Sequence, residues 1–459
     1  MSWRSDSAAV WLLSSALVLC SLLSAGAGQG TDAPPLTLSE CIKEALANNP
    51  GLRADTARSS AVDHAAAAAR SVRFPRLDLA SDYSYSDRPQ RLVQPSYQGE
   101  VLRYDNDLAQ AIAEIRVPLF SGGRLVARQK AAELAAAAGR INLFASRQDL
   151  VLNVTAAYLT AAEQRSVLDA IDASLNALKE QRKIAEAMKS VGRIAPLDLL
   201  KVEVRAAAVE QRRSKAGRDR DLIHIHLATL LGRDPQGPLP RVADVPTLPP
   251  MEAPNMEALL SETLAQSPGL NALKQDAARR LAELAQVKAE RWPSLDAFGR
   301  WTVRSVVASA GSPIPGHQAF FMTGLTLKFP LWTSGEMASR ERQAEALWNE
   351  ARERVRTSEL QGREQVQREA AALAEAGDRS RVAEKAAKQA LEAFEIERAN
   401  YELGRAAVND LLDAQTALLD AELALAQARH DIAYASVALA WAAGRNLEEW
   451  LLPGKRDGQ

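Results

Sequence analysis

The chain is a tandem duplication of one half-molecule. Two motifs recur at an offset of 218 residues and three at an offset of 212. They are Pro50-Gly51-Leu52 with Pro268-Gly269-Leu270, Phe74-Pro75-Arg76-Leu77-Asp78 with Trp292-Pro293-Ser294-Leu295-Asp296, Val117-Pro118-Leu119-Phe120 with Phe329-Pro330-Leu331-Trp332, Val191-Gly192-Arg193 with Leu403-Gly404-Arg405, and Gly232-Arg233 with Gly444-Arg445. The period is far longer than the ~20–50 residues of a solenoid repeat. We therefore predict two equivalent halves, 28–233 and 256–445, which a Pro-rich linker, 234–255, joins and a tail, 446–459, follows.

The N-terminus has the features of a secretory signal peptide. Arg4 provides the positive charge, and the apolar run from Ala8 to Leu23 follows it. Small residues then offer a cleavage site after Ala27. We therefore predict that residues 1–27 are a signal peptide and that the mature chain is exported.

Two cysteines bear on how the exported chain is processed. Lipidation would make Cys20 the first mature residue, but Leu19 before it is bulkier than the small residue that such processing favours. Cleavage after Ala27 instead leaves Cys41 as the only thiol, so no intramolecular disulfide can form. No later stretch approaches the ~20 apolar residues of a transmembrane helix. The exported chain can therefore cross a membrane only as strands.

The composition indicates long helices and argues against several functional classes. Ala, Leu, Glu, Arg and Gln dominate, aromatic residues make up 5%, and the net charge of −1 argues against nucleic-acid binding. No Ser-His-Asp constellation, Gly-rich phosphate loop or Cys cluster indicates a catalytic or cofactor site. His224 and His226 are two residues apart, so they lie on different faces of a helix and make a poor metal pair. We predict no enzymatic activity, no cofactor and no metal site.

Each half contains a very long helix between two shorter ones. The predicted helices are Ser39–Ser71, Arg124–Ser190 and Pro196–Leu231 in the first half, and Met256–Glu290, Glu336–Glu402 and Ala406–Ala443 in the second. At 1.5 Å per residue the long helix would reach about 100 Å. Val167/Leu168, Ile171, Leu175 and Leu178 recur at the spacing of a coiled-coil seam. The simplest assembly places the two shorter helices end to end beside the long one.

Four segments between these helices alternate between apolar and polar residues. The apolar positions are Leu77, Leu79, Tyr83 and Tyr85; Ala111, Ala113, Ile115, Val117 and Leu119; Leu295, Ala297, Trp301 and Val303; and Phe321, Leu325, Leu327 and Phe329. This period-two pattern is typical of outer-membrane barrel strands, although a soluble β-hairpin shows the same alternation. Two hairpins in an exported chain with such long helices favour the membrane. Because four strands cannot close a barrel, we expect three copies to pool twelve.

The chain resembles the TolC-type outer-membrane efflux proteins over nearly its whole mature length. The resemblance rests on the segment Leu36–Pro50, on the Phe-Pro-x-Leu joint, on the Val-Pro-Leu-Phe-Ser-Gly-Gly joint that ends at Arg124, and on the duplicated Gly-Arg turns. It implies a mostly α-helical chain with membrane β-strands. Its homotrimer would form a 12-stranded barrel in outer-membrane lipid, continued by a coiled-coil helical barrel across the periplasm. It also implies a periplasmic adaptor protein and an inner-membrane pump as partners. We expect the linker and the tail to lie around the waist of this tunnel.

Each half also carries a helical turn that is followed by an acidic residue. The turns are Val191-Gly192-Arg193, before Pro196, and Leu403-Gly404-Arg405. Asp198 and Asp410 follow these turns at matched register, and Asp413 lies one helical turn after Asp410. Helix capping would explain Asp198 and Asp410 but explains Asp413 less well.

The resemblance assigns these residues to a gate at the periplasmic end of the tunnel. It implies that Asp198, Asp410 and Asp413 face inward around a constricted entrance, where threefold symmetry gathers them into a cation-favouring carboxylate ring. It also implies that the tips, Val191–Arg193 and Leu403–Arg405, dock the adaptor. The family's gating arginine is replaced here by Ala406, so the links that lock the closed state are rearranged.

Two functions follow as hypotheses. The first is a passive export duct in the outer membrane, which takes substrate from a pump and an adaptor and holds no nucleotide site of its own. Drugs, metal ions and secreted polypeptides all remain open as its cargo. The second is a non-conducting periplasmic coiled-coil adaptor or envelope scaffold whose hairpins fold as a soluble domain. The alternating strands and the duplicated tips favour the duct.

Overall fold

A computed structural model describes residues 35–87, 91–92, 102–103, 107–243, 255–306 and 317–452. The predicted signal peptide with Cys20, residues 244–254 of the linker and residues 453–459 of the tail lie outside the described residues. The described helices are α1 Leu38–Asn48, α2 Pro50–Ser71, α3 Arg124–Ser190, α4 Pro196–Leu230, α5 Met256–Gln266, α6 Pro268–Ala289, α7 Glu336–Glu402, α8 Val408–Ala442 and α9 Leu447–Leu451. The described strands are β1 Arg76–Tyr85, β2 Arg91–Leu92, β3 Leu102–Arg103, β4 Asp107–Phe120, β5 Ser294–Val306 and β6 His317–Lys328.

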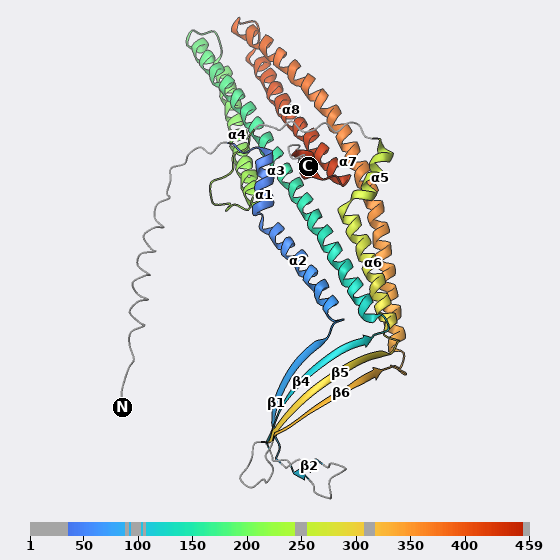
Figure 1. Ribbon diagram of the computed structural model, residues 1–459. Coiled ribbons are helices and arrows are strands. Elements are labelled where there is room, and N and C mark those ends of the chain that lie inside the picture. Colours follow the sequence, from blue (N-terminus) through green and yellow to red (C-terminus); the bar gives the residue numbers. More distant parts are fainter. Residues whose placement is uncertain are drawn as a thin grey trace, which may run out of the picture.

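The two long helices have the predicted bounds. Each of α3 and α7 has 67 residues and starts after a left-handed glycine, Gly123 or Gly335. The shorter helices α2 and α4 pack along α3, and α6 and α8 pack along α7, in the end-to-end arrangement that we expected (Figure 1). The helix α3 also contacts α6 and α8, which joins the two repeats. No helix in the described ranges is both long and apolar enough to cross a membrane.

The prediction of one unbroken helix at the start of each repeat is wrong. Residues 39–71 form two helices, α1 and α2, which separate at Asn49, and α5 and α6 separate at Ser267. Both positions precede a proline, whose ring disfavours a helical conformation in the residue before it. The Asn49 side chain then accepts a hydrogen bond from the Leu52 N–H at 3.0 Å and caps the new helix. In the second repeat, α8 also begins two residues later than predicted.

The strands form one antiparallel sheet in the order β1-β4-β5-β6, and β2 pairs with β3. The register places Leu79, Ala113, Trp301 and Phe321 in one row across the four strands. The next row carries Asp78, Glu114, Arg300 and Met322, and Arg300 donates to Glu114 at 2.6 Å and 2.8 Å. The predicted alternation is therefore confirmed, with one apolar and one polar face.

The main apolar core lies midway along the helices, and we call it the waist cluster. Its buried members are Leu38, Cys41, Ile42, Ala45, Leu52, Leu150, Val151, Val154, Ala157, Tyr158, Ala161, Leu227, Leu231, Val242, Val437, Ala440 and Leu447. Val242 belongs to the linker and Leu447 to the tail, so the described parts of both pack at this level, as expected. Leu36 pairs with the linker through hydrogen bonds to Arg241 and Ala243.

The duplicated Gly-Arg turns anchor the same joint in each repeat. Arg233 donates to both carboxylate oxygens of Glu44 at 2.5 Å and 2.6 Å. Arg445 makes the equivalent pair with Glu262 at 3.0 Å and 3.1 Å. Bidentate arginine–carboxylate pairs have a defined geometry. They therefore orient the end of α4 on α1 and the end of α8 on α5, and they explain why both residues of the motif recur.

Candidate functional site at the helical tips

The two Gly-Arg turns at the far end of the helices are exposed hairpin tips, which lie opposite the sheet (Figure 1). Gly192 and Gly404 adopt left-handed backbone angles, with φ of 72° and 70°. The N–H groups of Arg193 and Arg405 donate to the carbonyls of Met188 and Asn400 at 2.9 Å and 2.8 Å. This pattern satisfies the last carbonyls of α3 and α7. A Cβ added to either glycine would meet nothing within 4 Å, so both tips are open.

Asp410, one of the three predicted gate residues, caps its own helix. Its carboxylate accepts a hydrogen bond from the Ala407 N–H at 3.3 Å, at the start of α8. Asp198 occupies the matched position in α4, but no side-chain cap forms there, and its carboxylate instead contacts Lys201 Nζ at 3.4 Å. A side-chain cap therefore forms at Asp410 and not at Asp198, although each acid lies in the first turn of its helix, where it complements the helix dipole.

Asp413 has no capping role and is far more exposed than Asp198. Its side chain is 79% exposed, against 28% for Asp198. The nearest cation is Arg205 of α4, whose Nη2 lies 3.8 Å from Asp413 Oδ1. An exposed pair of this kind contributes little to stability, about 0–1 kcal/mol. The carboxylate of Asp413 is therefore largely open to solvent in the single chain.

The structure brings Asp413 into a groove between α4 and α8. The groove is lined by Leu197, Leu200, Lys201, Val204, Arg205 and Ala208 of α4 and by Asn409, Leu412 and Asp413 of α8. Leu200 and Val204 are exposed in the single chain. Asp410 and Asp198 do not line this groove. The three acids are thus near one end of the molecule but do not form one cluster within a protomer.

A second apolar core, the tip cluster, supports this end. Its buried members are Ile171, Leu175, Leu178, Val202, Val209, Ala216, Phe394, Tyr401, Val408, Leu411, Leu412 and Leu419. It includes the predicted seam residues of α3, with Val167 and Leu168 partly buried against it. Ala406, at the family's arginine position, also packs against this cluster. An apolar contact therefore stands where an arginine was expected to form a link.

Tyr401 is a residue of this site that the sequence analysis missed. Its side chain is 5% exposed, and its hydroxyl is buried without a hydrogen-bond partner among the described residues. Burial raises the pKa of Tyr401, and the charge of Asp198 raises it further. A tyrosine three residues before a turn glycine is not a recognisable motif, so nothing in the sequence indicated this site. Only the fold shows that the Tyr401 hydroxyl lies near Asp198.

We expect Tyr401→Phe to leave the stability of the protein unchanged or to increase it by about 1 kcal/mol, because it removes an unsatisfied buried hydroxyl. Thermal denaturation of the purified protein, compared with wild type, checks this. A clear loss of stability would mean that a neighbouring protomer supplies a partner for the hydroxyl.

His224 and His226, which the sequence analysis considered a poor metal pair, have different environments. No group of three or more His, Cys, Asp and Glu side chains in the described ranges has the geometry of a metal site. Burial lowers the pKa of His224, and a hydrogen bond with the Pro240 backbone acts in the opposite direction. His226 is exposed on the same helix. The two histidines thus lie in different surroundings, as their spacing predicts.

The chain thus combines paired long helices, a four-stranded sheet with one apolar face and open helical tips. Residues 41–233 and 259–445 match the outer membrane efflux protein family, one match for each repeat. The chain belongs to this family: it is an outer-membrane efflux channel that extends into the periplasm. The predicted fold class is confirmed, and the predicted localisation with it.

Solved structures of outer-membrane channels share this fold. The outer-membrane channel OprN is 20% identical, with a TM-score of 0.76 over 90% of each chain. VceC from Vibrio cholerae is 21% identical, with a TM-score of 0.74 over 89% of this chain and 96% of that one. CusC is 18% identical, with a TM-score of 0.76 over 93% and 96%. No curated protein matches the chain.

Proposed function

We propose that the protein is the outer-membrane duct of a tripartite efflux or secretion system. An inner-membrane pump supplies the energy, a periplasmic adaptor binds the tips Val191–Arg193 and Leu403–Arg405, and substrate leaves passively through the barrel. Family membership supports the channel role. The open space around Gly192 and Gly404 supports docking at the tips. The channel itself performs no catalysis.

We further propose that Asp198, Asp410 and Asp413 form the periplasmic gate of the trimer. The observation that carries this proposal is the 79% exposure of Asp413 at the tip end of α8, one helical turn beyond Asp410. Three copies of these acids around a threefold axis would favour cations at the entrance.

The charge and the capping role of Asp410 are separable by substitution. Asparagine keeps a carbonyl oxygen that can accept the Ala407 N–H, whereas alanine removes the cap as well. We expect Asp410→Asn with Asp413→Asn to weaken block by multivalent cations about tenfold or more, since tenfold corresponds to 1.4 kcal/mol of lost attraction. We also expect conductance to rise, because cations are held less tightly at the entrance once the carboxylates are neutral. Planar-bilayer recordings of the purified trimer measure both quantities.

Asp420→Asn is the matched control for this experiment. Asp420 also lies on α8 and pairs with an arginine of α4, Arg212, at 2.9 Å, but it lies further from the tip. It should leave both block and conductance near wild type. If multivalent cations blocked the double variant as strongly as the wild type, Asp410 and Asp413 would have only local structural roles. Absence of channels from well-folded protein in several lipids would favour the scaffold hypothesis.

A further inference from the structure

One row of residues interrupts the polar face of the sheet. The strand register aligns four residues across β1, β4, β5 and β6, and none of them is charged: Ala80, Ile112, Thr302 and Phe320. Charged residues occupy the rows on either side of it. The trimeric barrel of this family turns the apolar face of the sheet to lipid, so the polar face lines the lumen. This row therefore exposes apolar side chains to the lumen.

The exposure of Phe320 is not explained by packing within the sheet. Phe320 lies opposite Thr302, which is buried, but its own side chain remains 40% exposed. Phe298, on the same face, differs because its ring packs against Gly324, where an added Cβ would lie 2.9 Å from Phe298 Cζ. Phe298 thus covers a stretch of backbone that has no side chain of its own. Phe320 instead keeps an open aromatic surface, to which another ring can stack.

Arg304 lies over the Phe320 ring and has unused hydrogen-bonding capacity. Its Cζ is 5.3 Å from the centroid of the ring. Its Nε donates to Gln110 Oε1 at 3.3 Å, and among the described residues no carboxylate binds its guanidinium. A guanidinium has five N–H donors in a planar fork. The donors of the two terminal nitrogens are therefore free to bind an anionic ligand.

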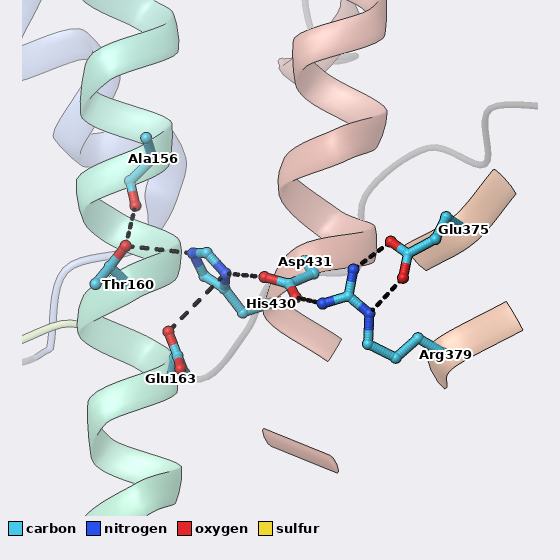
Figure 2. Close-up of polar contacts among 7 residues, drawn as sticks. All are labelled: Ala156, Thr160, Glu163, Glu375, Arg379, His430 and Asp431. Atoms are coloured by element: carbon cyan, nitrogen blue, oxygen red, sulfur yellow. Dashed lines mark hydrogen bonds and ion pairs between the residues drawn. The ribbon is translucent and has the colours of Figure 1, made fainter. Parts of the chain in front are cut away.

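Other arginines of the chain have their charge neutralised by carboxylates. On the same face of the sheet, Arg300 donates twice to Glu114, at 2.6 Å and 2.8 Å. In the helical part, Arg379 binds both Glu375 and Asp431, at 2.9 Å and 2.7 Å (Figure 2). Arginines in such pairs are engaged in holding the fold together. The guanidinium on the Phe320 ring has no equivalent role.

The acid in the same row as Arg304 is Asp82 of β1, and Gln110 of β4 lies between them. Two strand spacings separate Asp82 from Arg304, which is about 10 Å. Both carboxylate oxygens of Asp82 accept from Gln110 Nε2, at 2.9 Å and 3.0 Å. The row thus has its negative charge on β1 and its positive charge on β5, beside the aromatic ring of β6.

We propose that Phe320 and Arg304 form a weak binding site in the barrel lumen for organic anions that contain a flat aromatic ring. The ring of the ligand stacks on the exposed surface of Phe320, and its anionic substituent accepts hydrogen bonds from Arg304. Weak binding suits an exit path, because a tightly held ligand would not leave. The identification of aromatic anions as a favoured class of cargo rests on the proposed function, whereas the binding site itself does not.

Binding can be measured on the purified trimer in lipid nanodiscs. Pyrenetetrasulfonate is a suitable probe, since it is a flat aromatic anion whose charge keeps it out of lipid. Fluorescence anisotropy at constant ionic strength should show saturable binding to the trimer and none to empty nanodiscs. Inorganic sulfate should compete poorly, because it lacks the aromatic ring.

Three substitutions test the site itself. Arg304→Gln should weaken binding about fivefold, through loss of the exposed cation. Phe320→Leu keeps an apolar side chain but removes the aromatic face, and it should weaken binding about two- to tenfold. Asp82→Asn should strengthen binding, because it removes a negative charge and keeps an oxygen that can accept from Gln110. A folding defect would not produce a gain of affinity.

Arg352→Gln is the matched control. Arg352 of α7 also lies over an aromatic ring, that of Trp348, at 5.0 Å, but this pair is outside the sheet. Its substitution should leave the affinity unchanged. Absence of saturable binding, or an affinity that neither Arg304→Gln nor Phe320→Leu lowers, would overturn the proposal. A loss in Arg304→Gln alone would also overturn it, because the lumen would then only attract anions in general.

This measurement needs no pump, no adaptor and no conduction. A trimer that binds the probe at this site but forms no channel would contradict the duct proposal alone. A trimer that conducts but does not bind the probe would contradict the binding site alone.

Discussion

Gly232→Ala is expected to destabilise the protein much more than Gly192→Ala, although both glycines have the same backbone conformation. Their φ values are 74° and 72°, so an alanine at either position meets a similar left-handed strain of about 1–2 kcal/mol. At position 232 the new Cβ would also lie 2.6 Å from the carbonyl oxygen of Asn48. That atom is backbone and cannot rotate away. Overpacking of this kind costs a further ~1–3 kcal/mol.

The second repeat supplies an internal replicate of this experiment. A Cβ on Gly444 would lie 2.8 Å from the backbone nitrogen of Ser267, whereas a Cβ on Gly404 would meet nothing within 4 Å. The four single variants should thus fall into two groups, with lower thermal midpoints for Gly232→Ala and Gly444→Ala. All four should be measured at one scan rate, because large proteins often unfold irreversibly. Equal midpoints in the two groups would show that the helix joints yield to accommodate a methyl group.

Tyr158→Ala is expected to cause the largest loss of stability of any single truncation in the waist cluster. Tyr158 is 1% exposed. Among the described residues, it has the largest side chain that is fully buried. Truncation of a large buried aromatic side chain costs about 3–5 kcal/mol, because the cavity left behind does not collapse fully. The thermal midpoint of the variant should therefore be lower than that of the wild type. Because the linker and the tail pack on this cluster, limited proteolysis should also cleave both segments faster in the variant.

Tyr158→Phe separates packing from hydrogen bonding at the same position. The Tyr158 hydroxyl donates to the Leu36 carbonyl at 3.3 Å. Removal of the hydroxyl should cost about 1 kcal/mol. If Phe and Ala weakened the protein equally, the hydrogen bond to Leu36 would account for the effect of Tyr158, and cavity formation would not.

The sequence alone predicted the elements whose cause is local. The bounds of α3 and α7 follow from glycines that favour left-handed turns and from long runs of helix-forming residues between them. The faces of the sheet follow from alternation along each strand, which chain geometry enforces without any partner. The break at Asn49 was missed even though its signal, the following Pro50, is local. The continuous helical composition on both sides concealed it.

The tertiary structure alone decided which distant residues meet. Asp413 lies beside Arg205, Glu44 beside Arg233, and Glu163 beside His430. Nothing in the local sequence marks these pairs, because exposed acids and bases are common on every face of these helices. The duplication predicted that the repeats are equivalent, but not that α3 would contact α6 and α8 of the second one. Helical periodicity is a property of neighbouring residues, whereas the alignment of two helices depends on how their side chains pack along the whole contact.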